Sequence, residues 1–208
     1  MKRTFLAALA FFPLAHATPA SCQDAAGGGV GWSFSASAYA YFVPDADDFL
    51  VPIVTADRGK LHLEARYQYE AMDSGSVWAG ANFDGGTKVE WEVTPMVGLV
   101  FGDVDGLAPG YKGSVRWKSL ELYSEGEYVF DFSGPEGDFF YNWSELTVSP
   151  LEWLRVGIAT QRTRAYASDR DLQRGLMAGF TFGRAAATVY VLNPDDDPTW
   201  IVAAGLEF

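Results

Sequence analysis

The feature that most constrains this chain is a two-residue alternation of side chains, clearest in its last ten residues, TWIVAAGLEF. One set of alternate positions is bulky and apolar: Trp200, Val202, Ala204, Leu206 and Phe208. The intervening set, at positions 199, 201, 203, 205 and 207, is mostly small or polar and ends in a carboxylate. Successive side chains of a β-strand point to opposite faces, so this stretch predicts a strand with one apolar face.

The same alternation recurs along the chain from about residue 31. It predicts twelve strands, at 31–43, 49–57, 60–71, 75–84, 88–101, 111–123, 126–132, 138–148, 151–165, 173–183, 185–192 and 198–208. The runs at 126–132 and 185–192 are shorter than the roughly 9–11 residues of a membrane-spanning strand, so ten strands are the alternative. No helical period extends beyond one or two turns, and the chain is predicted to be all-β.

Two all-β classes fit this pattern, a soluble sandwich and a closed membrane barrel. In KLHLEARYQYEAM, the apolar set at 61, 63, 65, 67, 69 and 71 faces one way and the polar set faces the other, as in either class. Aromatic residues, however, gather at strand ends, as they do in the interfacial girdles of membrane barrels. These residues are Trp32, Phe42, Phe83, Phe101, Phe182, Trp200 and Phe208.

The predicted connections alternate between long acidic loops and tight turns. One set is VPDADDF, MDSG, GDVDGLAPG, SGPEGD, ASDRDLQ and NPDDDP, and the other is ADRGK, DGGTK, SEGE, SPLE and FGRA. Long loops at one end and short turns at the other are typical of outer-membrane barrels, whereas a sandwich gives no reason for such an asymmetry. The loops therefore favour a membrane barrel.

The closing strand resembles that of Gram-negative outer-membrane barrels, porin-like proteins among them, whose assembly machinery reads a terminal aromatic residue preceded by alternate hydrophobic positions. Trp200, Val202, Leu206 and Phe208 match this pattern. The resemblance implies a single antiparallel transmembrane β-barrel over residues 31–208, with the barrel-assembly machinery as a partner through those four residues. It also implies a bacterial outer-membrane location with both termini in the periplasm. We expect a monomer in contact with outer-membrane lipid and lipopolysaccharide. Because an open strand edge is not tolerated in hydrocarbon, the last strand is expected to pair with the first.

The N-terminal residues predict export from the cytoplasm. Two basic residues precede an apolar stretch at 4–14, and Ala15-His16-Ala17 is a small-x-small cleavage site, so residues 1–17 are predicted to be a signal peptide. Residues 18–30 are predicted to be a flexible periplasmic lead-in. Cys22 is the only cysteine, which excludes an internal disulfide. With 27 acidic against 15 basic residues, nucleic acid is not an expected partner. No cofactor and no metal site is predicted.

The inward-facing set of the predicted barrel carries charges of both signs. The candidate lumen-lining residues are His62, Glu64, Arg66, Glu90, Glu92, Arg116, Lys118, Glu127, Asp131 and Arg155. Bare charges are costly to bury, so these are expected to be paired or hydrated. The leading hypothesis is a small passive channel for polar solutes with a mixed-charge lumen. The alternative is a closed structural or surface-interaction barrel filled by a salt-bridge network. No plug domain and no long inward-folding loop is evident in the sequence, which favours some opening.

A lipid-acting outer-membrane enzyme is the third hypothesis. After removal of the signal peptide His62 is the only histidine, and no nucleophile is evident near it in the sequence. A general base without a nucleophile does not make an active site, so we predict no enzymatic activity and no catalytic residue.

Overall fold

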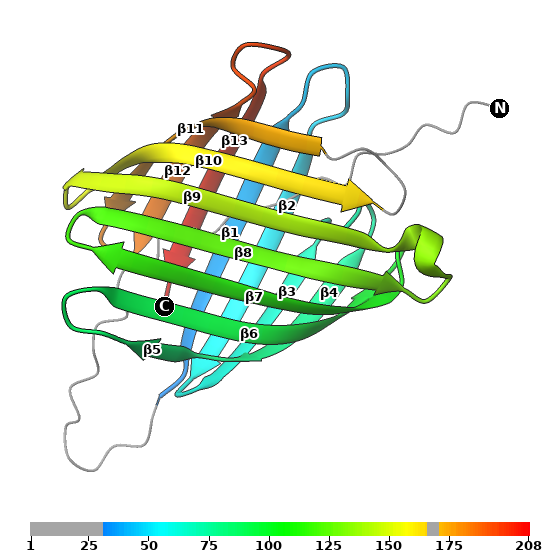
Figure 1. The fold of residues 1–208 in the computed structure, drawn as a ribbon, viewed down its shortest axis with the longest axis horizontal. Helices are drawn as coiled ribbons and strands as arrows, with labels where there is room; N and C mark the ends of the chain where they lie inside the picture. Colours follow the sequence, from blue (N-terminus) through cyan, green and yellow to red (C-terminus); the bar gives the residue numbers. More distant parts are fainter. Residues whose placement is uncertain (1–30, 166–170) are drawn as a thin grey trace.

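The computed structural model describes residues 31–165 and 171–208. The signal peptide predicted over residues 1–17 and the lead-in predicted over 18–30 lie outside this part of the chain. The described residues form one antiparallel sheet that closes on itself as a barrel (Figure 1). Its strands are β1 (Ser33–Phe42), β2 (Phe49–Arg58), β3 (Leu61–Tyr67), β4 (Gly75–Ala81), β5 (Phe83–Gly85), β6 (Glu90–Phe101), β7 (Gly106–Trp117), β8 (Leu120–Asp131), β9 (Phe139–Leu151), β10 (Leu154–Ala165), β11 (Asp171–Phe182), β12 (Ala185–Leu192) and β13 (Thr199–Glu207).

The barrel has twelve strand positions. The short β4 and β5 both pair with β6 and follow one another along the same position of the wall. The barrel closes where β1 pairs with β13, with Ala38 opposite Ala204. The Phe208 N–H extends this pairing by donating to the Phe34 carbonyl at 2.9 Å. The prediction of a single antiparallel barrel of about twelve strands is confirmed, and the alternative of ten strands is wrong.

The two ends of the barrel differ in the length of their connections. At the end that we call the loop end, described connections span 43–48, 68–74, 102–105, 132–138 and 193–198, and one of them contains the 3₁₀ turn Pro135–Gly137. At the opposite turn end, where β1 begins and β13 ends, connections span 59–60, 86–89, 118–119, 152–153 and 183–184. The acidic loops predicted from the sequence, insofar as they are described, lie at the loop end, although GDVDGLAPG was predicted too long because residues 106–110 belong to β7.

Several predicted strand boundaries are wrong: β7, for example, begins at Gly106 instead of residue 111. The sequence placed a turn at SEGE, residues 124–127, but β8 continues through this stretch and the chain turns at Lys118 and Ser119. Lys118 takes the left-handed conformation, φ 57°, that such a tight turn needs. The strand predicted over 60–71 also ends early, at Tyr67, because Gln68 adopts a positive φ of 54° and redirects the chain.

The outer surface of the barrel is apolar. Large side chains such as Val97, Leu99 and Ile158 point outward, and each is about half exposed. All seven aromatic residues predicted for the girdles are exposed as well. A contiguous apolar surface of this extent is suited to acyl chains rather than to water. Within the described residues, no helix is long and apolar enough to cross a membrane.

The inside of the barrel is packed with side chains. One buried cluster joins strands on both sides of the β1–β13 seam with β8 and β9: Tyr39, Tyr41, Phe49, Val51, Ile53, Tyr69, Tyr123, Tyr141, Trp143, Ala159, Met177, Tyr190, Leu192, Ile201 and Ala203. A second lies on β4 and β6–β9: Trp78, Met96, Val100, Ala108, Val129 and Phe139. Trp143, Tyr190 and Leu192 have no exposed surface at all. The middle of this barrel is therefore closed by its own side chains, which include many aromatic rings.

Candidate functional site: the charged lumen

The centre of the lumen is organised around Arg66 of β3. Its Nε donates to Glu64 on the same strand, and its Nη1 donates to Glu127 of β8 at 2.9 Å. Three strand positions, those of β4, β6 and β7, separate β3 from β8 in the wall. Lys112 of β7 donates to the second oxygen of Glu64. These contacts tie distant parts of the wall together, and we call Glu64, Arg66, Lys112, Glu125 and Glu127 the waist.

Two aromatic rings enclose the Arg66 guanidinium. The centre of the guanidinium lies 3.8 Å from the Tyr69 ring and 4.4 Å from the Trp78 ring. Trp78 lies flat against the inner wall because Gly98 beneath it has no side chain, and a Cβ there would come within 2.4 Å of the indole. The alternation of β4 and the glycine of β6 together place this ring, which explains why a Gly lies in the middle of a strand.

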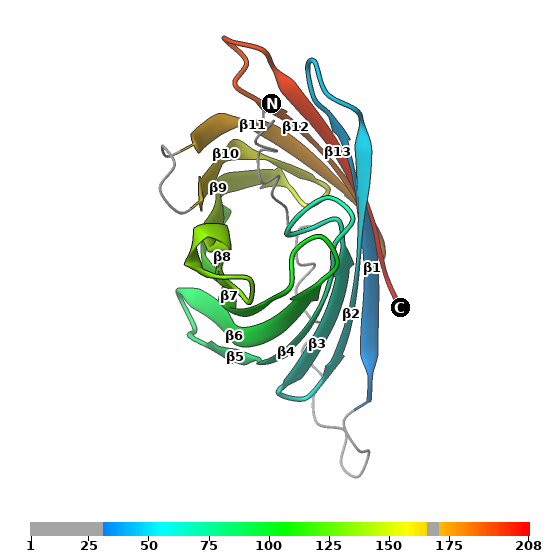
Figure 2. The ribbon, with the colours of Figure 1, turned by 90° about the vertical axis from the view of Figure 1, so that its right-hand side faces the viewer.

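The connection between β3 and β4, residues 68–74, folds into the lumen and contradicts the expectation that no loop does so. We call it the strap, and Figure 2 shows it inside the outline of the barrel. Tyr69, Glu70 and Ser74 are all buried. Tyr69 donates to Glu125 of β8 at 3.0 Å, and its ring meets Tyr141 of β9 edge-on at 6.2 Å.

The second buried group of the strap, Glu70, points back towards the wall. It accepts hydrogen bonds from Ser76 at 2.6 Å and from the Trp78 indole at 3.3 Å, and it lies 3.7 Å from Arg66. The strap was missed because the sequence continued the β3 alternation through residue 71, which assigned Tyr69 to the lipid face. Two left-handed residues, Gln68 and Asp73, lie on either side of the buried Tyr69 and Glu70.

His62 joins the waist to the turn end of the barrel. Its Nδ1 lies 2.8 Å from Asp57 and its Nε2 lies 3.1 Å from Glu64, so both ring nitrogens face carboxylates. A protonated imidazole donates from both nitrogens and suits this position. Asp57 also accepts from Asn82, which in turn accepts from Thr94. The network gives both ring nitrogens of His62 a carboxylate partner.

A second ion pair is buried between β9 and β10. Arg155 donates to Glu145 at 3.0 Å, and Glu145 also accepts hydrogen bonds from the indole of Trp143 and the hydroxyl of Tyr190. The Trp143 and Tyr190 rings meet edge-on with centroids 5.8 Å apart. The Glu145 carboxylate is therefore held by three donors in a dry, aromatic environment.

The lumen becomes wetter towards the turn end. Arg116 of β7 pairs with Glu121 of β8 at 2.9 Å, and their side chains are 26% and 13% exposed. On β6 Glu92 is half-buried and Glu90, opposite Arg116, is exposed. We call this partly hydrated region of Glu90, Glu92, Arg116 and Glu121 the vestibule.

The remaining two candidates lie outside the lumen proper. Lys118, assigned to the lumen because the turn was placed at SEGE, instead lies exposed in the β7–β8 turn, with its ammonium over the Trp117 ring. Asp131 ends β8 at the loop end, where it accepts the Ser133 N–H at 2.6 Å.

The structure therefore divides the predicted residues among several places. Glu64, Arg66 and Glu127 meet at the waist, and His62 contacts it through Glu64. Glu90, Glu92 and Arg116 lie in the vestibule, and Arg155 lies apart with Glu145. Glu125 was missed because it falls between the predicted strands 111–123 and 126–132. The correct two-residue parity of β8 would have found it.

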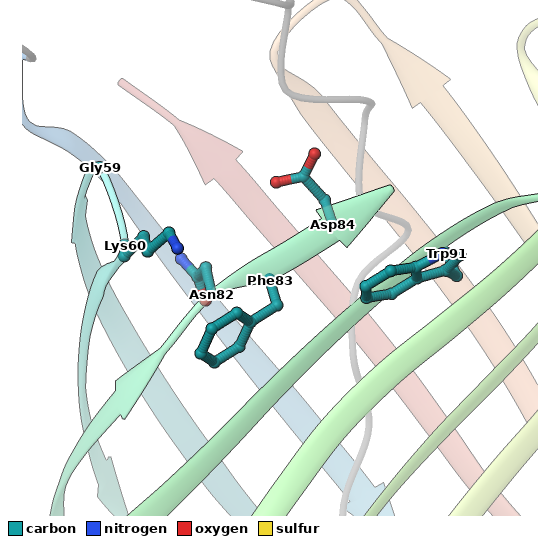
Figure 3. Close-up of a pocket in the computed structure, with 6 residues that line it drawn as sticks. All are labelled: Gly59, Lys60, Asn82, Phe83, Asp84 and Trp91. Atoms are coloured by element: carbon teal, nitrogen blue, oxygen red, sulfur yellow. The ribbon is translucent and has the colours of Figure 1, made fainter. Parts of the chain in front are cut away.

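Two shallow hollows lie at the ends of the wall rather than along its axis. One, of about 400 Å³, is at the turn end and is lined by Gly59, Lys60, Asn82, Phe83, Asp84 and Trp91 (Figure 3). The Lys60 ammonium lies 5.1 Å from the centre of the Phe83 ring. The other, of about 360 Å³, is at the loop end beside Leu172, Arg174 and residues 193–196. Neither hollow contains any of the predicted lumen residues.

Comparison with known proteins identifies the fold. No protein-family model matches the chain, and no curated protein sequence matches it. Among solved structures, the chain resembles the KdgM porin, with a TM-score of 0.60 at 11% identity over 84% of this chain and 99% of the porin. A KdgM porin in complex with disordered oligogalacturonate gives a TM-score of 0.58 at 11% identity, over 85% and 99%. The Acinetobacter baumannii outer membrane protein Omp33 gives 0.51 at 13% identity, over 87% and 100%. The chain therefore has the fold of outer-membrane porins.

Proposed function

We propose that this protein is a bacterial outer-membrane barrel that acts as a narrow channel for small polar solutes, occluded at rest by the strap and the waist. Strand β1 begins and β13 ends at the turn end, which we place in the periplasm with the acidic loops outside. The observation that carries the proposal is the position of the partly hydrated vestibule. It lies on the inner wall and leads to a waist that a loop, rather than the strands alone, closes.

The waist favours cations over anions. Three carboxyl groups of the waist, those of Glu64, Glu125 and Glu127, and that of Glu70 in the strap lie around two basic side chains, Arg66 and Lys112. Rings of charged side chains set the selectivity of cation pores in the same way. The oligogalacturonate named with the KdgM porin is a polyanion, and this waist would repel such a solute. We therefore infer that the solutes are neutral or cationic and small.

A closed structural barrel is the second candidate. The Arg66–Glu127 hydrogen bond and the fully buried Trp143 and Tyr190 favour it, because they fill the lumen at mid-height. In a closed barrel, the ion pairs serve only to neutralise one another's charges in the lumen. The two candidates differ in whether removal of the strap opens a conducting path.

Single-channel recording in planar bilayers separates them. We compare the wild-type barrel with a variant whose strap residues 69–72 are replaced by Gly-Ser-Gly-Ser. The wild type is expected to give small, infrequent steps, and the strap variant larger and longer ones, because Tyr69 and Glu70 no longer fill the waist. A matched control replaces residues 45–48 of the β1–β2 loop, which are exposed, by the same sequence and should behave as wild type. Silence of both the wild type and a correctly folded strap variant would leave the closed barrel as the function.

A further inference from the structure

The side chains around Arg66 form a cage with the shape and charge that a guanidinium group requires. Tyr69 and Trp78 cover the cation at 3.8 and 4.4 Å, and aromatic faces attract cations at such distances. Carboxylates of Glu64 and Glu127 meet the guanidinium with hydrogen bonds, and Glu70 lies 3.7 Å away. A planar fork of N–H donors between rings and carboxylates is the arrangement in which Arg binds best.

The cage holds more acceptors than its occupant satisfies. Glu70 Oε2 and Glu127 Oε1 are buried and have no hydrogen-bond partner among the described residues. Both side chains are more than nine-tenths buried. Buried carboxylate oxygens without donors are unfavourable, so these two positions retain a capacity for further N–H groups. The excess of acceptors distinguishes this cage from the Arg155–Glu145 pair, where one carboxylate meets three donors.

The occupant of the cage is also placed where it can be displaced. Arg66 is the second residue before Gln68, at which the chain leaves β3 for the strap. Tyr69, which covers one face of the guanidinium, belongs to that strap. On the other side, Lys112 contacts Glu64 and keeps 16% of its side chain exposed, so the cage borders the wetter part of the lumen.

We propose that this cage is a binding site for the guanidinium group of a small solute, and that Arg66 is its internal, displaceable occupant. The proposal rests on the channel function for the access of solute, and it deepens that function by naming the solute class. In the resting barrel Arg66 closes the site. When Arg66 swings away with the strap, Tyr69 and Trp78 supply the faces and Glu64, Glu70 and Glu127 the acceptors for a solute's guanidinium.

Chemical rescue tests the cage without reference to conductance. The full chain is refolded in detergent as wild type, Arg66→Ala and, as a matched control, Arg155→Ala, which removes the other buried lumen arginine. Methylguanidinium is titrated at millimolar concentration while Trp fluorescence and the thermal midpoint are followed, with sodium chloride at equal concentration as the ionic control. Arg66→Ala should be stabilised by several degrees by methylguanidinium only, and Arg155→Ala and the wild type by much less.

Further variants keep the test decisive. In the Arg66→Ala background, Glu127→Gln should weaken the methylguanidinium response at least tenfold, because it removes a charged acceptor of the cage. If Arg66→Ala does not fold alone, methylguanidinium in the refolding buffer should restore its yield, and Arg66→Lys serves as the folded variant with a partly filled cage. The proposal is overturned if methylguanidinium stabilises Arg66→Ala no more than it stabilises Arg155→Ala. If Arg66→Ala does not fold, the same comparison is made with Arg66→Lys. If Arg66→Ala binds methylguanidinium but the barrel gives no conductance in bilayers, the cage is supported and the channel is contradicted. If the barrel conducts but Arg66→Ala does not bind methylguanidinium, the channel is supported and the cage is contradicted.

Discussion

At the scale of single residues, the lumen shows how ionised side chains are accommodated inside a barrel. Some buried charges are matched by several polar or aromatic partners rather than by one. Glu145 receives hydrogen bonds from Arg155, Trp143 and Tyr190, and Arg66 has two aromatic faces in addition to its carboxylates. Removal of one member of such a set leaves the others buried and unpaired, which is costly.

Replacement of Glu145 should therefore destabilise the barrel strongly. We expect Glu145→Ala to lower the free energy of unfolding by about 3–5 kcal/mol, because it leaves Arg155 buried without its counter-ion. Urea unfolding in detergent or lipid vesicles, followed by gel mobility with and without heating, measures this change.

The control is the partly exposed pair of the vestibule. Glu121→Ala, which frees Arg116, should cost no more than about 1 kcal/mol, because water solvates the remaining charge. Equal losses in the two variants would contradict the view that burial, rather than ion pairing itself, makes the Glu145 pair important.

At the scale of elements, the positions of strands follow from alternation, but the turns between them do not. SEGE has the polar, Gly-containing composition of a turn, yet Gly126 lies within β8, where the Tyr111 ring of β7 packs over it and a Cβ would come within 3.0 Å of that ring. The real turn, at Lys118 and Ser119, has no Gly or Pro. Neither cross-strand packing nor a left-handed lysine is visible in the local sequence.

The two possible turn positions respond differently to insertion. A Gly-Ser-Gly insertion between Lys118 and Ser119 should leave the folded barrel intact, because it only lengthens an exposed connection. The same insertion between Glu125 and Gly126 should abolish folding, since it shifts the inward set of β8 to the lipid face. The fraction of heat-modifiable protein after refolding measures both effects. If the second insertion is tolerated, the turn lies at SEGE, as the sequence predicted.

The same scale explains the error in the strap. The alternation of KLHLEARYQYEAM continues past Tyr67 in the sequence, but the backbone turns at Gln68 and brings both Tyr69 and Glu70 into the lumen. Strand β9 departs from the usual pattern in another way. Its inward set includes Tyr141 and Trp143 while the outward set has Asn142 and Ser144 at mid-strand, which reverses the usual polarity of a membrane barrel.

At the scale of the whole molecule, charge is arranged along the barrel axis. Acidic loops lie at one end, a waist with excess carboxylate lies at the centre, and the mixed vestibule lies at the turn end. This order exists only in the closed barrel, because Glu64, Lys112 and Glu127 come from strands far apart in the sequence. The proposed cation preference is a property of this arrangement rather than of any single residue.

Charge reversal in the vestibule should change ion selectivity. We expect Arg116→Glu to increase the preference for cations, seen as a shift of reversal potential in a potassium chloride gradient, because it adds negative charge to the inner wall. Lys118→Glu makes the same charge change in the exposed turn and should shift the reversal potential much less. An equal shift in both variants would indicate that net charge, rather than lumen position, controls selectivity.

The closing strand carries a separate prediction about assembly. Trp200, Val202, Leu206 and Phe208 all face outward and are exposed, and we propose that they are read by the barrel-assembly machinery. Phe208→Ala should reduce the amount of folded protein in the outer membrane several-fold in cells, while refolding in detergent stays near wild type because the Phe208 N–H bond is to a backbone carbonyl. Phe182→Ala removes an exposed aromatic residue of β11 at the same end of the barrel and is the control. If Phe208→Ala and Phe182→Ala reduce the amount of folded protein equally, the effect belongs to girdle aromatic residues in general rather than to the closing strand.

The sequence by itself determined the all-β class, the twelve-strand barrel, the closure of the last strand on the first and the apolar outer face. The class, the strands and the apolar face follow from a two-residue period that local side chains display directly, and the barrel and its closure from the loop asymmetry, the aromatic girdles and the closing strand. Only the tertiary structure decided that the strap enters the lumen, that Arg66 lies between Tyr69 and Trp78, and that Glu125 belongs to the waist. Those features depend on backbone reversals at single residues and on contacts across the barrel, and neither leaves a periodic trace in the chain.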